Sequence, residues 1–97
     1  MAGLERFPID QILEIVEKHG GLNPRVFGSR ARGDARDDSD LDLLIKAGPK
    51  MSLLDLIAIK QDLEDLLDIK VEVLTEGGLH PLLKDNILSE ARPLVAA

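Results

Sequence analysis

The feature that most constrains this chain is a motif near its middle: Gly28-Ser29, ten further residues, and then Asp40-Leu41-Asp42. Apolar residues typical of a buried strand follow at once. Successive side chains of a strand point to opposite faces, so Asp40 and Asp42 are expected on one face. Leu41, Leu43 and Ile45 then point to the other face. The motif predicts a small-residue turn, able to lie against a phosphate, followed by a strand that carries two carboxylates.

The two aspartates carry a free-energy cost that a metal ion would remove. On one face of a strand their Cβ atoms would lie roughly 6 to 7 Å apart, and at an effective dielectric near 20 the charges repel by roughly 2 to 3 kcal/mol. A divalent cation removes this repulsion, and such hard cations prefer oxygen ligands. Asp40 and Asp42 are therefore predicted to bind a divalent metal ion.

Composition narrows the class of protein. The 97 residues are expected to form a single domain spanning 1–97, and the chain has no cysteine for a disulfide or a thiolate site. Eighteen acidic against twelve basic side chains give a net charge of −6, which disfavours nucleic acid as the main ligand. No apolar run is long enough for a membrane helix, and no signal peptide is recognisable. We expect a cytoplasmic protein that binds neither membranes nor nucleic acid directly.

Apolar periodicity and turn residues predict that helices and strands alternate along the chain. The expected helices run from Pro8 to the stop at Gly20-Gly21, over residues 29–32 as a single turn, from Ser52 to 67, and from Pro81 to a stop at Pro93. The expected strands cover residues 25–27, 41–46 and 69–74. The alternation implies an α/β domain with a sheet of three or four strands.

The sequence also predicts the positions of individual side chains in these helices. Ser52 and Asp55 form a capping-box pattern at the start of the long helix. Its apolar face is expected to comprise Leu53, Leu56, Ile59, Leu63, Leu66 and Leu67. In the last helix, Leu83, Ile87 and Leu88 are expected to face inward. His19 is expected as a favourable charge at a helix end, and His80 as a cap or surface residue.

The Gly28-Ser29, ten-residue, Asp40-Leu41-Asp42 pattern resembles the signature of the minimal nucleotidyltransferases, small relatives of the polymerase-β palm. The order of the elements matches that family over nearly the whole chain. The resemblance implies a nucleotidyltransferase fold with a mixed sheet of three to four strands flanked by helices. It is closest to bacterial antitoxins that pair with HEPN ribonucleases. It implies an antitoxin that transfers AMP from ATP to a hydroxyl, expected to be that of a tyrosine, of a partner HEPN toxin.

The resemblance also implies a third carboxylate, in the strand after the long helix. Val71-Glu72-Val73 stands at that place, with Glu where the family carries Asp. Asp40, Asp42 and Glu72 are thus implied as catalytic residues and as ligands of two Mg²⁺ ions. The extra methylene of Glu72 moves its carboxylate further from the backbone, and a demanding metal geometry could weaken catalysis for that reason.

The expected phosphate contacts lie around the turn. Gly28 would let a triphosphate oxygen approach the backbone, and the Ser29 hydroxyl would bind it. Arg30 or Arg32 would offset charge on the leaving pyrophosphate, and the sequence leaves open which of them points inward.

Less specific interpretations remain open from the sequence alone. Glu72 is also compatible with an exposed polar strand position, and the arginines near the motif with simple balancing of the loop aspartates. The chain is also compatible with an inactive antitoxin that neutralises the toxin by binding alone. Another alternative keeps the chemistry and changes the acceptor to a small molecule or an RNA end. With a HEPN partner, a higher-order hetero-oligomer is a further option.

Overall fold

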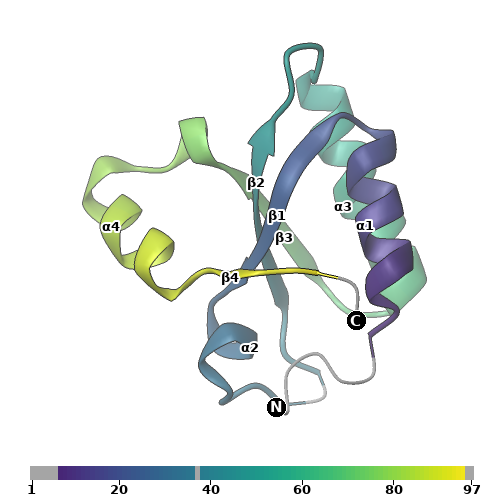
Figure 1. The fold of residues 1–97 in the computed structure, drawn as a ribbon. Helices are drawn as coiled ribbons and strands as arrows, with labels where there is room; N and C mark the ends of the chain where they lie inside the picture. The colour runs from purple at the N-terminus through teal and green to yellow at the C-terminus, as the bar shows by residue number, and fades with distance from the viewer. Residues whose placement is uncertain (1–6, 37, 96–97) are drawn as a thin grey trace.

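A four-stranded sheet forms the centre of the structure (Figure 1). The computed structural model describes residues 7–36 and 38–95, so Asp37 of the predicted acidic loop lies outside them. The elements along the chain are α1 (Ile9–Lys18), β1 (Gly21–Phe27), α2 (Ser29–Arg32), β2 (Leu41–Ala47), α3 (Leu53–Leu67), β3 (Val71–Thr75), the 3-10 turn η1 (Glu76–Gly78), α4 (Pro81–Glu90) and β4 (Arg92–Pro93). The strands stand in the order β3-β2-β1-β4. Only the β2–β3 pair is parallel, so the sheet is mixed, as predicted.

The core lies between the sheet and the helices α1 and α3, which cover the same face (Figure 1). Leu41, Leu43 and Ile45 of β2 are fully buried there, as their alternation predicted. Ile12 of α1 and Ile59 of α3 pack into the same cluster. Burying each such side chain contributes about 1.5 to 3 kcal/mol, which fixes the register of β2. Since side chains alternate along a strand, Asp42 lies on the opposite face of β2, which it shares with the buried Leu44.

The long helix α3 begins with the predicted capping box. The Ser52 hydroxyl accepts a hydrogen bond from the Asp55 N–H at 3.4 Å, and Asp55 Oδ2 accepts one from the Ser52 N–H at 2.9 Å. Leu53 was predicted on the apolar face, but it lies in the first turn of the helix with its side chain 71% exposed. Within residues 7–36 and 38–95, no helix combines the length and apolar character needed to cross a membrane.

Both histidines lie at helix ends and make polar contacts there. His19 lies at the end of α1 as predicted, and its Nε2 stands 2.9 Å from Asp62 Oδ2 on α3, which ties the two helices together. His80 caps α4, because its Nδ1 accepts a hydrogen bond from the Leu82 N–H.

Two strands begin at residues other than those predicted, and β2 and β3 each end one residue later than predicted. β1 begins at Gly21, earlier than the predicted residues 25–27, and Gly21 already pairs with Ala47 of β2. Asn23 has φ +50, and the register shifts between Leu22 and Arg25, so a bulge interrupts the strand. Residues 21–24 were not predicted as part of the strand, because they include glycine, asparagine and proline, which are typical of turns. β3 begins at 71 instead of 69.

Helix α4 corrects the prediction that its leucines face inward. Leu83 is 54% and Leu88 is 39% exposed, Ile87 is half-buried, and none of the α4 side chains, all of which the structure describes, is fully buried. Figure 1 shows α4 on the side of the sheet away from α1 and α3. Periodicity marks an apolar stripe but not whether another element covers it.

The chain after α4 returns to the sheet. The helix ends at Glu90, and Pro93, predicted to end it, lies in the edge strand β4 beside Arg25 of β1. An edge strand tolerates proline because one side of its backbone needs no partner strand. Leu94 is buried in the main core and donates its N–H to the Pro24 carbonyl.

Candidate active site

The Gly28 turn and the Asp42 carboxylate lie against each other. Phe27, the last residue of β1, is the register partner of Asp42 on β2, so the turn that follows is held beside it. Gly28 has φ +74, and a Cβ atom at this position would overlap Asp42 Oδ2. Glycine is therefore required both by the backbone conformation and by the space that the carboxylate fills. The sheet brings the two ends of the sequence motif together.

The third predicted carboxylate stands on the neighbouring strand. Glu72 of β3 is the parallel register partner of Asp42, and its side chain is exposed. Register partners in a sheet project to the same face, so both carboxylates belong to the face opposite the core. Asp40 precedes β2 and is exposed as well.

The negative charges of Asp40 and Glu72 act on the Asp42 carboxyl. Burial raises the pKa of the Asp42 carboxyl above its usual value, and the negative charges of Asp40 and then Glu72 raise this pKa further. Arg32 lowers the Asp42 pKa, and Glu90 makes a smaller contribution that raises it. Like charges raise a carboxyl pKa because they disfavour its ionised form. The site therefore carries an excess of negative charge around Asp42.

The donor set matches a hard divalent cation in its chemistry. Asp40, Asp42 and Glu72 offer only oxygen ligands, and the raised Asp42 pKa marks repulsion that a cation would relieve. Within residues 7–36 and 38–95, no three acidic, histidine or cysteine side chains are already grouped as a metal site. Asp40, Asp42 and Glu72 are the residues that would hold such an ion.

Arg30 supports the loop that leads to Asp40. Its side chain is only 4% exposed, and its guanidinium lies 4.7 Å from the centre of the Phe7 ring. Nη2 donates to the carbonyl of Ser39 at 2.7 Å and to that of Arg36 at 3.3 Å. These contacts close the loop between α2 and β2, so Arg30 helps to position Asp40 directly before the strand.

Arg32 has a different position. It is exposed at the end of α2, with Nε 3.4 Å from Asp34 Oδ2 and Nη1 3.4 Å from Glu90 Oε2. It also acts on the charge of Asp42, as described above. The Arg32 charge therefore acts on the carboxylate site from the end of α2. Ser29 is the first residue of α2, directly before Arg30, and its carbonyl accepts the Gly33 and Asp34 N–H groups.

Glu90 is a site residue that the sequence did not single out. Its Oε1 accepts a hydrogen bond from the Gly28 N–H at 2.8 Å, although the two residues lie far apart in the chain. No local pattern indicates this contact, because it depends on where the last turn of α4 lies relative to the Gly28 turn. Asp42 and Glu90 thus lie against the Gly28 turn, while Asp40, Glu72 and Arg32 act on the charge of Asp42.

Comparison with known proteins decides the family. The family model described as "Nucleotidyltransferase domain" matches residues 9–94, nearly the whole chain. The chain belongs to this nucleotidyltransferase family. A relative in Methanocaldococcus jannaschii, which carries the provisional name protein adenylyltransferase, is 47% identical over 81 residues, covering 84% of this chain and 87% of its own. The protein adenylyltransferase MntA of Thermococcus cleftensis is 35% identical over 95 residues, covering 93% and 96%.

Solved structures of nucleotidyltransferases share the fold. One described as a minimal nucleotidyltransferase has a TM-score of 0.81 and 45% identity, and the match covers 92% of this chain and 91% of that one. A chain of the complex between a tri-AMPylated HEPN toxin of Shewanella oneidensis and its MNT antitoxin has a TM-score of 0.68, with 92% and 70% covered. At 15% identity this second likeness concerns the fold alone. The predicted family and fold are confirmed, and the chain is a nucleotidyltransferase.

Proposed function

We propose that this nucleotidyltransferase transfers AMP from ATP to a tyrosine hydroxyl of a partner HEPN toxin and so acts as its antitoxin. The observation that carries the proposal is the placement of Asp42 between the Gly28 turn and Glu72. A relative named protein adenylyltransferase MntA, similar over nearly the full length, supports a protein as the acceptor. The fold shared with an MNT antitoxin that binds an AMPylated HEPN toxin supports this kind of partner.

The reaction is a substitution at the α-phosphorus of ATP. The acceptor oxygen forms a bond to that phosphorus, the bond to the bridging oxygen of the β-phosphate breaks, and pyrophosphate leaves. The hydroxyl proton passes to a nearby carboxylate or to water. Two bound Mg²⁺ ions would supply charge neutralisation and a more acidic acceptor hydroxyl. Asp40, Asp42 and Glu72 are the residues that would hold them.

Other residues of the site would position the nucleotide. Gly28 has no side chain, so a phosphate oxygen can approach its backbone closely. The Ser29 hydroxyl would donate to the same phosphate group. Arg32 would offset the charge of the leaving pyrophosphate, because guanidinium matches phosphate in shape and charge. Arg30 was an equal candidate in sequence, and its contacts with the Ser39 and Arg36 carbonyls favour a role in shaping the loop.

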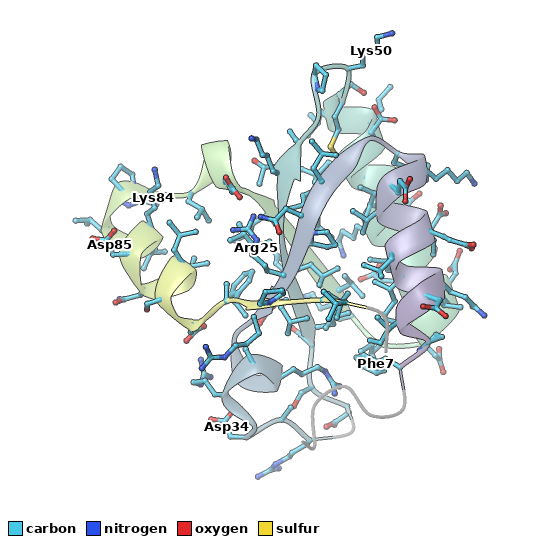
Figure 2. All side chains as sticks on the ribbon, in the orientation of Figure 1. Phe7, Arg25, Asp34, Lys50, Lys84 and Asp85 are labelled. Carbon is cyan, nitrogen blue, oxygen red and sulfur yellow. The ribbon has the colours of Figure 1, made fainter. Side chains whose placement is uncertain are left out.

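The test is transfer of label to the partner. The purified chain, a co-encoded HEPN protein, Mg²⁺ and α-labelled ATP are incubated, and the modified residue is located by mass spectrometry. We expect label on a tyrosine, and Glu72→Gln should lower the rate at least about 100-fold while stability changes by less than about 0.5 kcal/mol. Asp85→Asn is a matched control, because Asp85 is an exposed acid on the outer side of α4 (Figure 2).

An antitoxin that acts by binding alone is the second candidate. Two observations favour it: the exposed leucines of α4, which suit a protein contact, and the longer side chain at Glu72. This candidate predicts no label on the partner, with toxin neutralisation intact in the double variant Asp40→Ala/Asp42→Ala. Label on a small molecule or an RNA end, instead of on the HEPN protein, would show that the chain transfers AMP to a different acceptor.

A further inference from the structure

The Glu90 carboxylate contacts two groups that would bind the phosphates of ATP in the proposed function: the Gly28 N–H and the Arg32 side chain. Its Oε1 accepts the Gly28 N–H at 2.8 Å, and its Oε2 lies 3.4 Å from Arg32 Nη1. A carboxylate and a phosphate oxygen are both anionic acceptors and compete for the same donors. The Gly28 turn therefore already holds an anion supplied by the far end of the chain.

The helix that carries Glu90 is weakly anchored. None of the α4 side chains, which the structure describes in full, is fully buried, and Leu82 is 82% exposed. The apolar anchor comes only after the helix, at Leu94. Since α4 contributes nothing to the main core, it can change position without opening that core. The Glu90 contacts are thus a polar tie between α4 and the Gly28 turn.

We propose that Glu90 is an internal competitor of the nucleotide: its carboxylate holds the Gly28 N–H and Arg32 until the triphosphate displaces it and thereby releases α4. This inference rests on the proposed function, because it assumes that ATP binds at the Gly28 turn. It adds that nucleotide binding and the contact between α4 and the turn oppose each other. Leu82 and Leu83 of α4 would then change their position when ATP binds.

A role for Glu90 as a metal ligand predicts the opposite sign. If Glu90 held Mg²⁺, removing its charge would weaken the binding of ATP in the presence of Mg²⁺ and leave binding in EDTA unchanged. If Glu90 competes with phosphate, removing its charge strengthens ATP binding under both conditions. The sign of the change therefore separates the two roles.

The experiment measures ATP affinity by calorimetry in EDTA and in Mg²⁺ for wild type, Glu90→Gln and Glu90→Ala. We expect about five- to tenfold tighter binding in both variants, since a charge-assisted contact no longer competes. Asp85→Asn removes the same charge from the same helix on its outer side and should bind ATP like wild type (Figure 2). A tightening shared by Asp85→Asn would reflect net charge alone and overturn the proposal.

Hydrogen exchange of the wild type gives a second measurement that needs no variant. Adding ATP should speed amide exchange in residues 81–90 while residues 53–67 of α3 stay unchanged. Equal or weaker ATP binding by the Glu90 variants, or slower exchange in 81–90, overturns the competition and leaves the proposed function intact. Absence of ATP binding in every variant overturns both proposals.

Discussion

Asp42 and Glu72 are direct neighbours on parallel strands, although the whole of α3 separates them in the chain. A parallel pair requires a crossover connection, and the packing of α3 on the sheet fixes how far β3 slides along β2. The hydrogen bonds of Lys60 and Glu64 to the backbone of Val71 hold the start of β3 in that register. The helix thus sets the place of the third carboxylate at the site.

Neutralising Asp42 should stabilise the fold at neutral pH. The folded chain raises the Asp42 pKa, chiefly by burial, so it binds the proton more tightly than the unfolded chain does. Stability is therefore lost as pH rises above the usual aspartate pKa of 3.8 and through the raised folded value. We expect Asp42→Asn to be more stable than wild type at pH 7, by less than the roughly 2 to 3 kcal/mol of repulsion given above, since the Asp40 and Glu72 charges are exposed to solvent.

Urea denaturation from pH 3 to pH 8 measures this effect. The difference between Asp42→Asn and wild type should shrink to nothing in acid, where the carboxyl is protonated in both states. Nucleotidyl transfer should fall at least about 1,000-fold in the same variant. A variant less stable than wild type at pH 7 would show that the Asp42 charge is compensated in the fold.

Gly28 and Gly33 allow the cost of backbone strain to be separated from the cost of crowding. Both have positive φ, +74 and +84, but a Cβ atom meets Asp42 only at Gly28, and it finds nothing within 4 Å at Gly33. Gly33→Ala should cost about 1 kcal/mol from the backbone alone. Gly28→Ala should cost about 1 to 2 kcal/mol more, because Asp42 must move.

Thermal unfolding and ATP calorimetry on both alanine variants provide the measurement. We expect Gly33→Ala to retain ATP affinity within about twofold and Gly28→Ala to lose it by more than about tenfold. Equal losses at the two glycines would contradict the close approach of the turn to Asp42.

Substitution of Arg30 should affect mainly stability, and substitution of Arg32 should affect mainly nucleotide binding. Arg30 is buried against Phe7 and bonded to loop carbonyls, so Arg30→Ala should lower the free energy of unfolding by about 2 to 4 kcal/mol. Arg32 is exposed, so Arg32→Ala should change stability by less than about 0.5 kcal/mol. ATP affinity should fall in Arg32→Ala, measured by calorimetry. An unfolded Arg32→Ala, or a fully stable Arg30→Ala, would contradict these assignments.

Glu64 should give a pH dependence of the opposite sign to Asp42. Its hydrogen bonds to Lys60 and then to the Val71 N–H lower the pKa of the Glu64 carboxyl. A lowered pKa contributes stability above the usual value of 4.5, and this stability is lost as pH falls through the folded value. Glu64→Gln should be less stable than wild type at pH 7, and the gap should close in acid.

Asp65→Asn, an exposed acid on the same helix, is the control for Glu64→Gln. Its unfolding curve should follow wild type across the same pH range. If the gap between Glu64→Gln and wild type persisted below pH 3, charge would not be its cause.

Local patterns in the sequence were sufficient for most of the fold and the centre of the site. The alternation from Leu41 to Ile45 placed β2, and the Ser52–Asp55 capping box placed the start of α3. The spacing from Gly28 to Asp42 identified the motif. These features depend on neighbours in the chain, and backbone sterics, capping and burial of one strand face act on them directly.

Only the tertiary structure decided the contacts between distant parts of the chain. The sequence alone determined a nucleotidyltransferase motif on an α/β frame, because turn chemistry and periodicity are local. It did not determine that the α4 leucines stay exposed, that Arg30 rather than Arg32 is buried, or that Glu90 reaches the Gly28 N–H. Those outcomes depend on how the helices pack against the finished sheet. The periodicity of one segment does not specify which other segment packs against it.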